Sequence, residues 1–225
     1  MTAKLSFQNL AMLFSLHACR FRFQAVERIH FPAAKSGNLL RGAFGMIFRR
    51  IAPAEVYERI FRPQQTGPGP SGFADPPRPF VFRASHLDGR TLSAGEQFEF
   101  TVYLFEKEPP VTYFTLAFEE FSSSGLGPAR GLARLEDVDA QPVTVDLACL
   151  EPATRALVRF LTPTEFKSDG RIVMRPQFGV LMRRVRDRVG SLRGPFLPYL
   201  RAAFYTGVGR HTVWGNGAIE TQVLE

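Results

Sequence analysis

His30 and Lys35 are residues whose types and spacing suit proton transfer and phosphate chemistry. They lie in the segment RIHFPAAKSGN, five residues apart. Histidine exchanges protons near neutral pH, and a lysine ammonium stabilises developing negative charge. The loop can place both side chains at the basic side of the helix that follows. His30 is therefore a candidate general acid or base and Lys35 a candidate for stabilising phosphate charge, although a solvated histidine explains His30 equally well.

A glycine-rich segment near the C-terminus, GVGRHTVWGNG, is the second candidate. Its glycines permit positive φ and close approach, so such a loop can follow a phosphate backbone. Arginine adds a forked donor set, and Trp or His can stack on a base. A tight glycine hairpin that packs on its own domain explains the spacing equally well, whereas a dinucleotide-binding turn is rejected because the loop precedes a strand. The candidate residues are Gly207, Gly209, Arg210, His211, Trp214, Gly215 and Gly217.

Metal and cofactor chemistry has little support in the sequence. The four histidines lie far apart, and the two cysteines, Cys19 and Cys149, have no zinc-binding spacing. We therefore expect no metal and no cofactor. His17 is expected to pack within a strand, and His86 to lie in an exposed turn.

The charge distribution favours a polyanionic partner. The chain has a net charge of +7, with basic residues concentrated at both ends and acidic residues in the middle. If the ends meet in space they form one positive face, although an unevenly charged, solvated surface is the alternative. The arginines predicted to form this face are Arg41, Arg49, Arg183, Arg184 and Arg210.

Hydrophobic periodicity predicts an α+β fold in two units. The first has strands near 10–18, 80–85, 97–105 and 131–138, and helices at 36–51, which Ser36 can cap, and at 111–121. The order strand, helix, strand, strand, helix, strand is that of the ferredoxin-like βαββαβ unit. The second unit has strands at 155–161 and 218–224, an amphipathic helix at 178–192 and a short helix at 198–205. It is too short for a complete copy of the first, so we expect domains at 1–140 and 141–225.

Several segments together resemble the CRISPR-associated precursor-RNA-processing endoribonucleases of the RAMP superfamily, the Cas six family. They are Phe31-Pro32 with Gly37–Gly45, Pro77–Phe82, Ala94–Phe105, Gly125–Gly127 with Arg130, Phe160–Lys167 and Gly207–Gly217. The segments occur in the family's order over nearly the whole chain. The chain departs from the family in having no cysteine cluster at 52–63 and a shortened second domain.

The resemblance implies tandem ferredoxin-like (RRM-like) domains, the second reduced, that bind CRISPR repeat RNA. It implies metal-independent cleavage by 2′-hydroxyl attack, which leaves 5′-hydroxyl and 2′,3′-cyclic phosphate ends. His30, Lys35 and, in competition, His211 are the expected catalytic residues, and the five arginines with the glycine-rich loop are the expected RNA-binding residues. Two alternatives are a non-catalytic RAMP subunit that holds CRISPR RNA in an effector complex, and a small α+β module with an unrelated acidic partner. The sequence has no recognisable signal peptide and no apolar run long enough to span a bilayer, so it predicts a cytoplasmic protein. The resemblance adds other CRISPR-associated effector subunits as expected partners.

Overall fold

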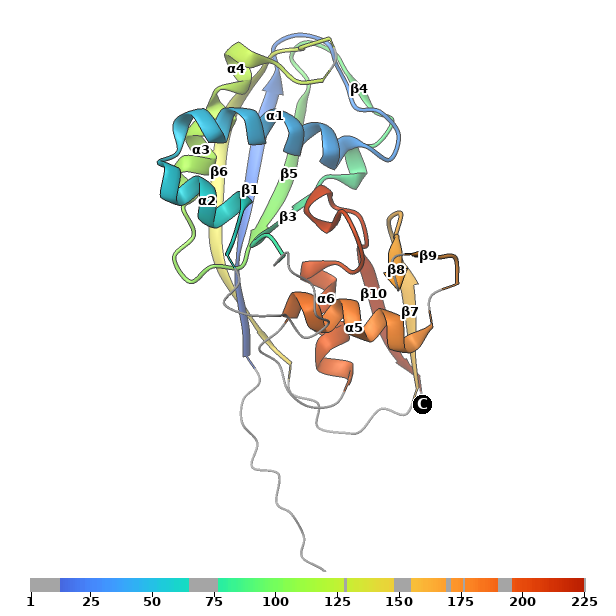
Figure 1. Cartoon of the computed structure of the whole chain (residues 1–225). Coiled ribbons are helices and arrows are strands. Elements are labelled where there is room, and N and C mark those ends of the chain that lie inside the picture. The colour runs from blue at the N-terminus through green and yellow to red at the C-terminus, as the bar shows by residue number, and fades with distance from the viewer. Residues whose placement is uncertain are drawn as a thin grey trace, which may run out of the picture.

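The computed structural model describes residues 13–64, 77–127, 129–147, 155–168, 171–175, 177–189 and 196–224 (Figure 1). Helices and antiparallel sheets together give the α+β class that the sequence predicts. The N-terminal unit consists of β1 (Leu13–Ala25), β2 (Ile29–His30), α1 (Ser36–Ile51), α2 (Ala54–Phe61), β3 (Phe80–Arg83), the 3-10 helix η1 (Ser85–Leu87), β4 (Thr91–Leu92), β5 (Gln97–Leu104), α3 (Val111–Glu119), α4 (Phe121–Ser124) and β6 (Ala133–Asp146).

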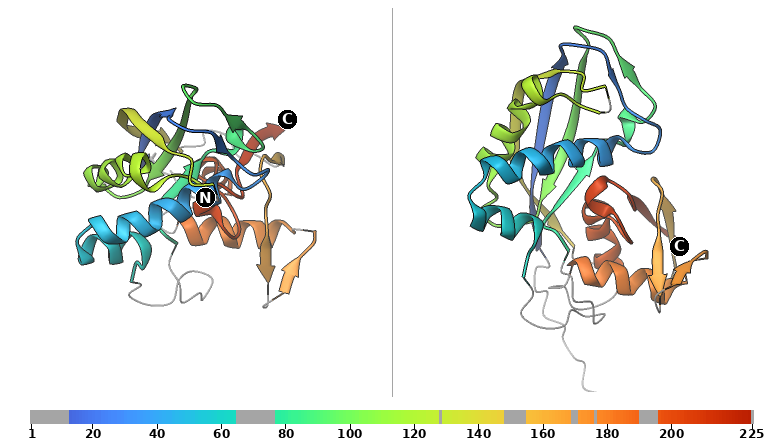
Figure 2. Two further views of the ribbon diagram at one scale, coloured as in Figure 1. Left: turned by 90° about the horizontal axis from the view of Figure 1, so that it is seen from above. Right: turned by 45° about the horizontal axis from the view of Figure 1, so that its top comes forward.

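Four of these strands form one sheet in the order β3-β5-β1-β6, with every neighbouring pair antiparallel. Strand β5 therefore separates β1 from β3, although α1 joins those two along the chain. This interposed strand is the feature of the split βαββαβ arrangement. Helices α1 and α3 cover one face of the sheet (Figures 1 and 2).

The core between helices and sheet is built largely from phenylalanine rings. Phe44 of α1 contacts Phe114 of α3 with ring centroids 4.7 Å apart, and Phe118 contacts Phe21 of β1 at 4.4 Å. These four side chains are fully buried. The helical spacing of Leu40 and Phe44 in 36–51 and the alternation of Phe98 and Phe100 in 97–105 predict one apolar face for each element, and both faces point into this core.

Strand β1 extends the expected strand at 10–18 to Ala25 and uses its two faces differently along its length; residues 10–12 of the expected strand lie outside the described part of the chain. Cys19, Phe21 and Phe23 point into the helix-covered core, whereas Phe14 belongs to the opposite face and packs against the C-terminal unit. Alternation through 10–18 identifies only the second of these faces. The strand continues to Ala25 because apolar and polar residues go on alternating. From Cys19 onward, however, the apolar residues are the odd-numbered ones, which point to the opposite face.

The described residues of the C-terminal unit form a separate, smaller core that includes Leu181 and Val185. The amphipathic pattern of 178–192 predicts that Phe178 faces inward, but this first residue of α5 is 57% exposed. No helix of the described ranges is long and apolar enough to cross a membrane. The elements are β7 (Arg155–Phe160), β8 (Phe166–Ser168), β9 (Arg171–Val173), α5 (Phe178–Val189), α6 (Phe196–Thr206), the 3-10 helix η2 (Thr212–Trp214) and β10 (Ile219–Leu224).

The two units are joined through the sheet face that the helices leave uncovered. Arg83 at the end of β3 donates from Nη2 to the carbonyl oxygens of Phe204 and Tyr205, 2.6 and 3.0 Å away. The Tyr205 ring also contacts Tyr103 of β5. Strand β6 extends to Asp146, beyond the expected domain end at 140, because its last residues still pair with the start of β1. The domain division itself stays a prediction.

Candidate nucleic-acid interface

The start of α1 is held by a neighbouring loop rather than by its own cap. Lys35 occupies the N-cap position without a side-chain hydrogen bond, so the expected capping role of Ser36 is wrong. Ser36 lies inside the helix, and its buried hydroxyl donates to the carbonyl oxygen of Ala84 at 2.7 Å. Asp88 Oδ1 accepts the Ser36 N–H at 2.9 Å and caps the helix from across the chain. These bonds fix the helix end next to which Lys35 stands.

His30 lies in the two-residue strand β2, which pairs with β4. Its Nδ1 is 2.9 Å from Thr91 Oγ1, and its side chain is exposed. The next residue, Phe31, is fully buried and donates its N–H to the carbonyl oxygen of Arg90 at 2.8 Å. The backbone that presents His30 is therefore anchored, while the ring stays open to solvent.

The glycine-rich loop meets this same end of α1. A Cβ at Gly37 would lie 2.0 Å from the carbonyl oxygen of Trp214, so only glycine permits the observed approach. Figure 1 and the right view of Figure 2 show η2 beside the N-terminal end of α1, above the C-terminal helices. Tertiary structure thus brings the two candidate segments of the sequence to one helix end.

The glycines of this loop are explained by contacts within the chain. A Cβ at Gly217 would lie 1.8 Å from the Val208 carbonyl oxygen, and one at Gly215 would lie 2.7 Å from that of Phe82. Gly217 also donates its N–H to the Pro163 carbonyl oxygen at 3.0 Å. The geometry favours the tight hairpin of the two interpretations for these glycines, and RNA contact by Gly207, Gly209, Gly215 and Gly217 stays a prediction.

His211 and Trp214 stack on each other, with ring centroids 4.0 Å apart and planes 13° from parallel. His211 also has a positive φ of 60°. Burial lowers the pKa of His211, the positive charge of Arg210 lowers it further, and Glu165 opposes both. The environment therefore favours a neutral imidazole.

The five predicted RNA-binding arginines differ in how they are held. Arg41 is half-buried over the Phe61 ring, and burial, reinforced by the charge of Arg78, lowers its pKa. Arg49 lies over the Tyr57 ring, with its guanidinium 5.9 Å from the ring centre. Arg183 is exposed on α5.

Arg184 and Arg210 make contacts within the C-terminal unit. Arg184 donates to the carbonyl oxygen of Lys167 in β8, and Arg210 forms an ion pair with Glu165. A side chain committed in this way contributes less to a new ligand, because it must first give up its present partner.

A groove of about 760 Å³ runs along the outer side of α1, between that helix and the loop after α4. Lys35 lines it at the N-terminal end, Met46 and Arg50 line it further along, and Arg130 lines the opposite wall. The periodicity of α1 indicates only which side is buried, so nothing in the sequence pointed to Met46, and Arg130 was marked only as part of a segment that resembles the family, without a binding role. The breaker cluster SSSGLGP before Arg130 is the one signal that could have indicated the wall.

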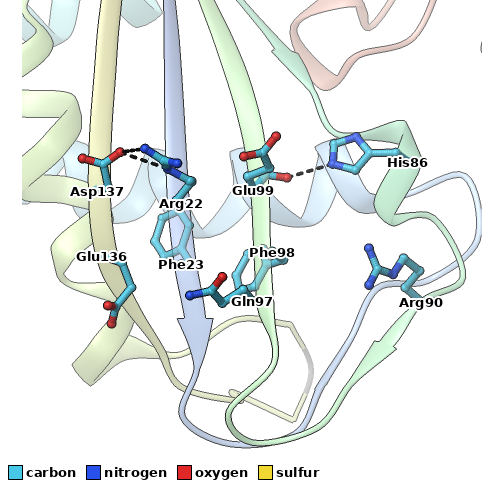
Figure 3. Close-up of a pocket in the computed structure, with 9 residues that line it drawn as sticks. All are labelled: Arg22, Phe23, His86, Arg90, Gln97, Phe98, Glu99, Glu136 and Asp137. Carbon is cyan, nitrogen blue, oxygen red and sulfur yellow. Dashed lines mark hydrogen bonds and ion pairs between the residues drawn. The ribbon is translucent and has the colours of Figure 1, made fainter.

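A second hollow, of about 380 Å³, lies on the uncovered face of the N-terminal sheet (Figure 3). It carries both signs of charge: Arg22 pairs with Asp137, while Glu99 and Arg90 stand nearby. His86 is exposed, as expected, and its Nε2 lies 2.8 Å from the Glu99 carbonyl oxygen. Phe23 and Phe98 lie behind this surface in the core, so they offer no exposed ring for base stacking.

Within the described ranges, no group of three His, Cys, Asp or Glu side chains is placed to hold a metal ion. His17 Nδ1 is buried without a hydrogen-bond partner, consistent with a packed strand residue. Metal independence of any reaction stays a prediction.

Comparison with known proteins gives one family and a set of similar folds. The family model AF_1859_N, an N-terminal domain, matches residues 13–155. The product complex of Cas6 TTHB231 matches with a TM-score of 0.56 and 17% identity, over 93% of this chain and 100% of that one. The product complex of Cas6 TTHA0078 matches with a TM-score of 0.54 and 17% identity, over 92% and 99%.

A larger protein shares the fold as well. A chain of a partial Cas6-RT-Cas1–Cas2 complex matches with a TM-score of 0.55 and 9% identity, over 93% of this chain and 46% of that one. No curated protein matches the sequence.

Proposed function

Because the chain belongs to the AF_1859_N family and has the Cas6 fold, we propose that it is an endoribonuclease that cleaves CRISPR repeat RNA. Solved structures of two Cas6 proteins with this fold are product complexes. The observation that carries the proposal is the contact of the glycine-rich loop with Gly37, at the N-terminal end of α1, next to the segment that holds the exposed side chains of His30 and Lys35. That end combines an exposed imidazole with basic side chains, which is what cleavage of a phosphodiester requires.

In the proposed reaction the RNA supplies its own nucleophile. A base removes the proton of a 2′-hydroxyl, whose oxygen attacks the adjacent phosphorus. The bond from phosphorus to the 5′-oxygen breaks, and an acid protonates that oxygen. The products are a 2′,3′-cyclic phosphate and a 5′-hydroxyl, with one proton removed and one delivered and no metal in either step.

His30 is the proposed proton carrier, and Lys35 the proposed cation beside the phosphorane. The contact of His30 Nδ1 with Thr91 Oγ1 leaves Nε2 for the substrate. His211 is the competing proton carrier, since its lowered pKa favours the neutral form that accepts a proton. Its stacking on Trp214 supports a positioning role instead.

We further propose that the RNA crosses from α1 over η2 to α5, and that the C-terminal unit is a reduced ferredoxin-like domain. Strands β7 and β10, the first and last of that unit, pair antiparallel, as do the first and last strands β1 and β6 of the N-terminal unit. The proposed RNA-binding residues are Arg41, Arg49, Arg183, Arg184, Arg210, Trp214 and the four loop glycines. CRISPR RNA and, by analogy with the Cas6-RT-Cas1–Cas2 assembly, other CRISPR-associated proteins are the proposed partners.

The test is incubation of the purified protein with repeat RNA from its own genome in the presence of a chelator. Chelator-resistant cleavage is expected, with a cyclic phosphate on the upstream fragment. The matched substrate has a single 2′-deoxynucleotide at the cut, and it should bind but stay intact because the nucleophile is absent. Binding without any cleavage would instead identify a non-catalytic RNA-holding subunit, and no binding at low salt would exclude both functions.

A further inference from the structure

One glycine of α1 has no structural reason to be glycine. Gly37 is required by the Trp214 carbonyl oxygen, and Gly45 would bring a Cβ within 3.2 Å of the Phe61 ring. Gly42 has nothing within 4 Å of the place a Cβ would occupy. A glycine inside a helix costs about 1 kcal/mol relative to alanine. Since no contact with the described residues offsets that cost, the open backbone at Gly42 suits the close approach of a ligand.

Gly42 lies in the groove along α1, and the groove is basic. Lys35 and Arg130 line it, and neither has an ion-pair partner in the part of the chain that the structure describes. A third cation, Arg50, pairs with Glu120 at 2.9 Å. None of the described residues that line the groove is acidic, while Met46, 75% exposed, adds an apolar surface. This combination suits a single nucleic-acid strand, because cations bind its phosphates and an apolar surface contacts its bases.

The groove is continuous with the proposed reaction centre. Pro32 and Lys35, which follow His30 along the chain, line its N-terminal end. On the other wall, a Cβ at Gly127 would lie 3.7 Å from the His30 carbonyl oxygen. From Lys35 to Arg50 the helix rises about 22 Å, at 1.5 Å per residue. An extended strand can therefore leave the reaction centre and follow the groove without a break.

We propose that this groove binds the single-stranded RNA segment that adjoins the cut bond on one side. The segment's phosphates contact Lys35 and Arg130, its backbone passes over Gly42, and a base packs on Met46. The inference rests on the proposed function, and it adds a second binding surface, separate from the one across η2 and α5.

The experiment measures affinity for repeat RNAs shortened one nucleotide at a time, from each end in separate series. With the wild-type protein, affinity should fall in the series that shortens the flank bound in the groove. The other series shortens the part of the RNA that binds across η2 and α5, so it measures the contribution of that surface. Gly42→Leu puts a Cβ where no atom lies within 4 Å and extends a bulky side chain into the groove, so removing that flank should no longer lower RNA affinity. Arg130→Ala should lower affinity for the flanked RNA about tenfold, as loss of one charge-assisted phosphate contact does.

Two controls separate this proposal from general effects. Gly42→Ala adds only a methyl group and should retain most of the flank dependence, while thermal unfolding checks that Gly42→Leu stays folded. Arg155→Ala removes an equal charge from an exposed position on β7, away from the groove, and should leave the flank dependence unchanged. If the wild type cleaves repeat RNA but Gly42→Leu shows the same flank dependence, the groove proposal is wrong and the proposed function stands. If the wild type binds no RNA, both fail.

Discussion

At the scale of single residues, His30 is the side chain on which the proposed cleavage depends most. A general acid or base contributes about 10²–10⁴-fold in rate. We expect His30→Ala to slow single-turnover cleavage of repeat RNA by that factor and to leave RNA affinity nearly unchanged, because the exposed ring supports no buried contact. Single-turnover rates and equilibrium binding measure the two effects.

His86→Ala is the matched control, since His86 is also exposed but belongs to η1 and lines the hollow at the uncovered face of the sheet. It should cleave at the wild-type rate. Cleavage by His30→Ala at the wild-type rate would refute the assignment. Loss of cleavage in His211→Ala, with binding intact, would transfer the chemistry to the glycine-rich loop.

His211 also predicts a pH dependence of stability. Burial and Arg210 lower its pKa from the usual 6.5, so below that pH the unfolded chain takes up a proton more readily than the folded chain. The contribution of His211 is therefore present above about pH 6.5 and is lost as the pH falls. His211→Asn keeps the positive φ, which asparagine tolerates, and removes the titrating group.

Melting temperatures of both proteins, measured from about pH 8 to about pH 5, test this expectation. The wild type should lose stability relative to His211→Asn as the pH falls. A constant difference across that range would contradict the pKa shift.

At the scale of elements, the glycines of α1 make opposite predictions within one helix. Gly37→Ala should lower the free energy of unfolding by about 1–3 kcal/mol, because its Cβ would overlap the Trp214 carbonyl and force α1 and η2 apart. The Cβ of Gly42→Ala contacts no other atom, so this substitution should raise the free energy of unfolding by up to about 1 kcal/mol through the higher helix propensity of alanine. Urea denaturation measures both, and equal effects would show that the contact between α1 and η2 is absent in solution.

At the scale of the whole molecule, Arg83 is the residue that connects the two units. Burial lowers its pKa to about 10, and its guanidinium binds two carbonyl oxygens at the end of α6. Arg83→Met should therefore lower the free energy of unfolding by about 2 kcal/mol, since hydrogen bonds to charged groups are among the stronger ones. Arg90→Met, which removes an exposed arginine at the sheet hollow, is the control and should change it by less than about 0.5 kcal/mol.

The salt dependence of RNA binding measures how many phosphate contacts the protein makes across its whole surface. Each phosphate contact changes the slope of log affinity against log salt by about 0.7 for single strands. Arg183→Ala, at an exposed position, should reduce the slope by about that amount for all repeat-like RNAs. Arg184→Ala should in addition loosen β8, because Arg184 donates to the Lys167 carbonyl oxygen. An unchanged affinity and slope in both would remove α5 from the binding surface.

The sequence alone determined the elements with strong local periodicity. The predicted helix at 36–51, the strand at 97–105 and most of the helix at 111–121 agree with α1, β5 and α3, because the repeat of apolar residues within an element is a local property of the sequence. The two candidate segments around His30 and Gly207–Gly217 also followed from residue types and spacing. Their chemistry is a property of the side chains and needs no tertiary contact to be suspected.

Only the tertiary structure decided how these pieces meet. Asp88 caps α1 in place of Ser36, Trp214 explains Gly37, and Arg210 is paired with Glu165. Each of these contacts joins residues far apart in the chain, so no local pattern encodes it. The switch of faces along β1 has the same cause: one strand lies in two cores, and the second core is supplied by residues that follow much later in the sequence.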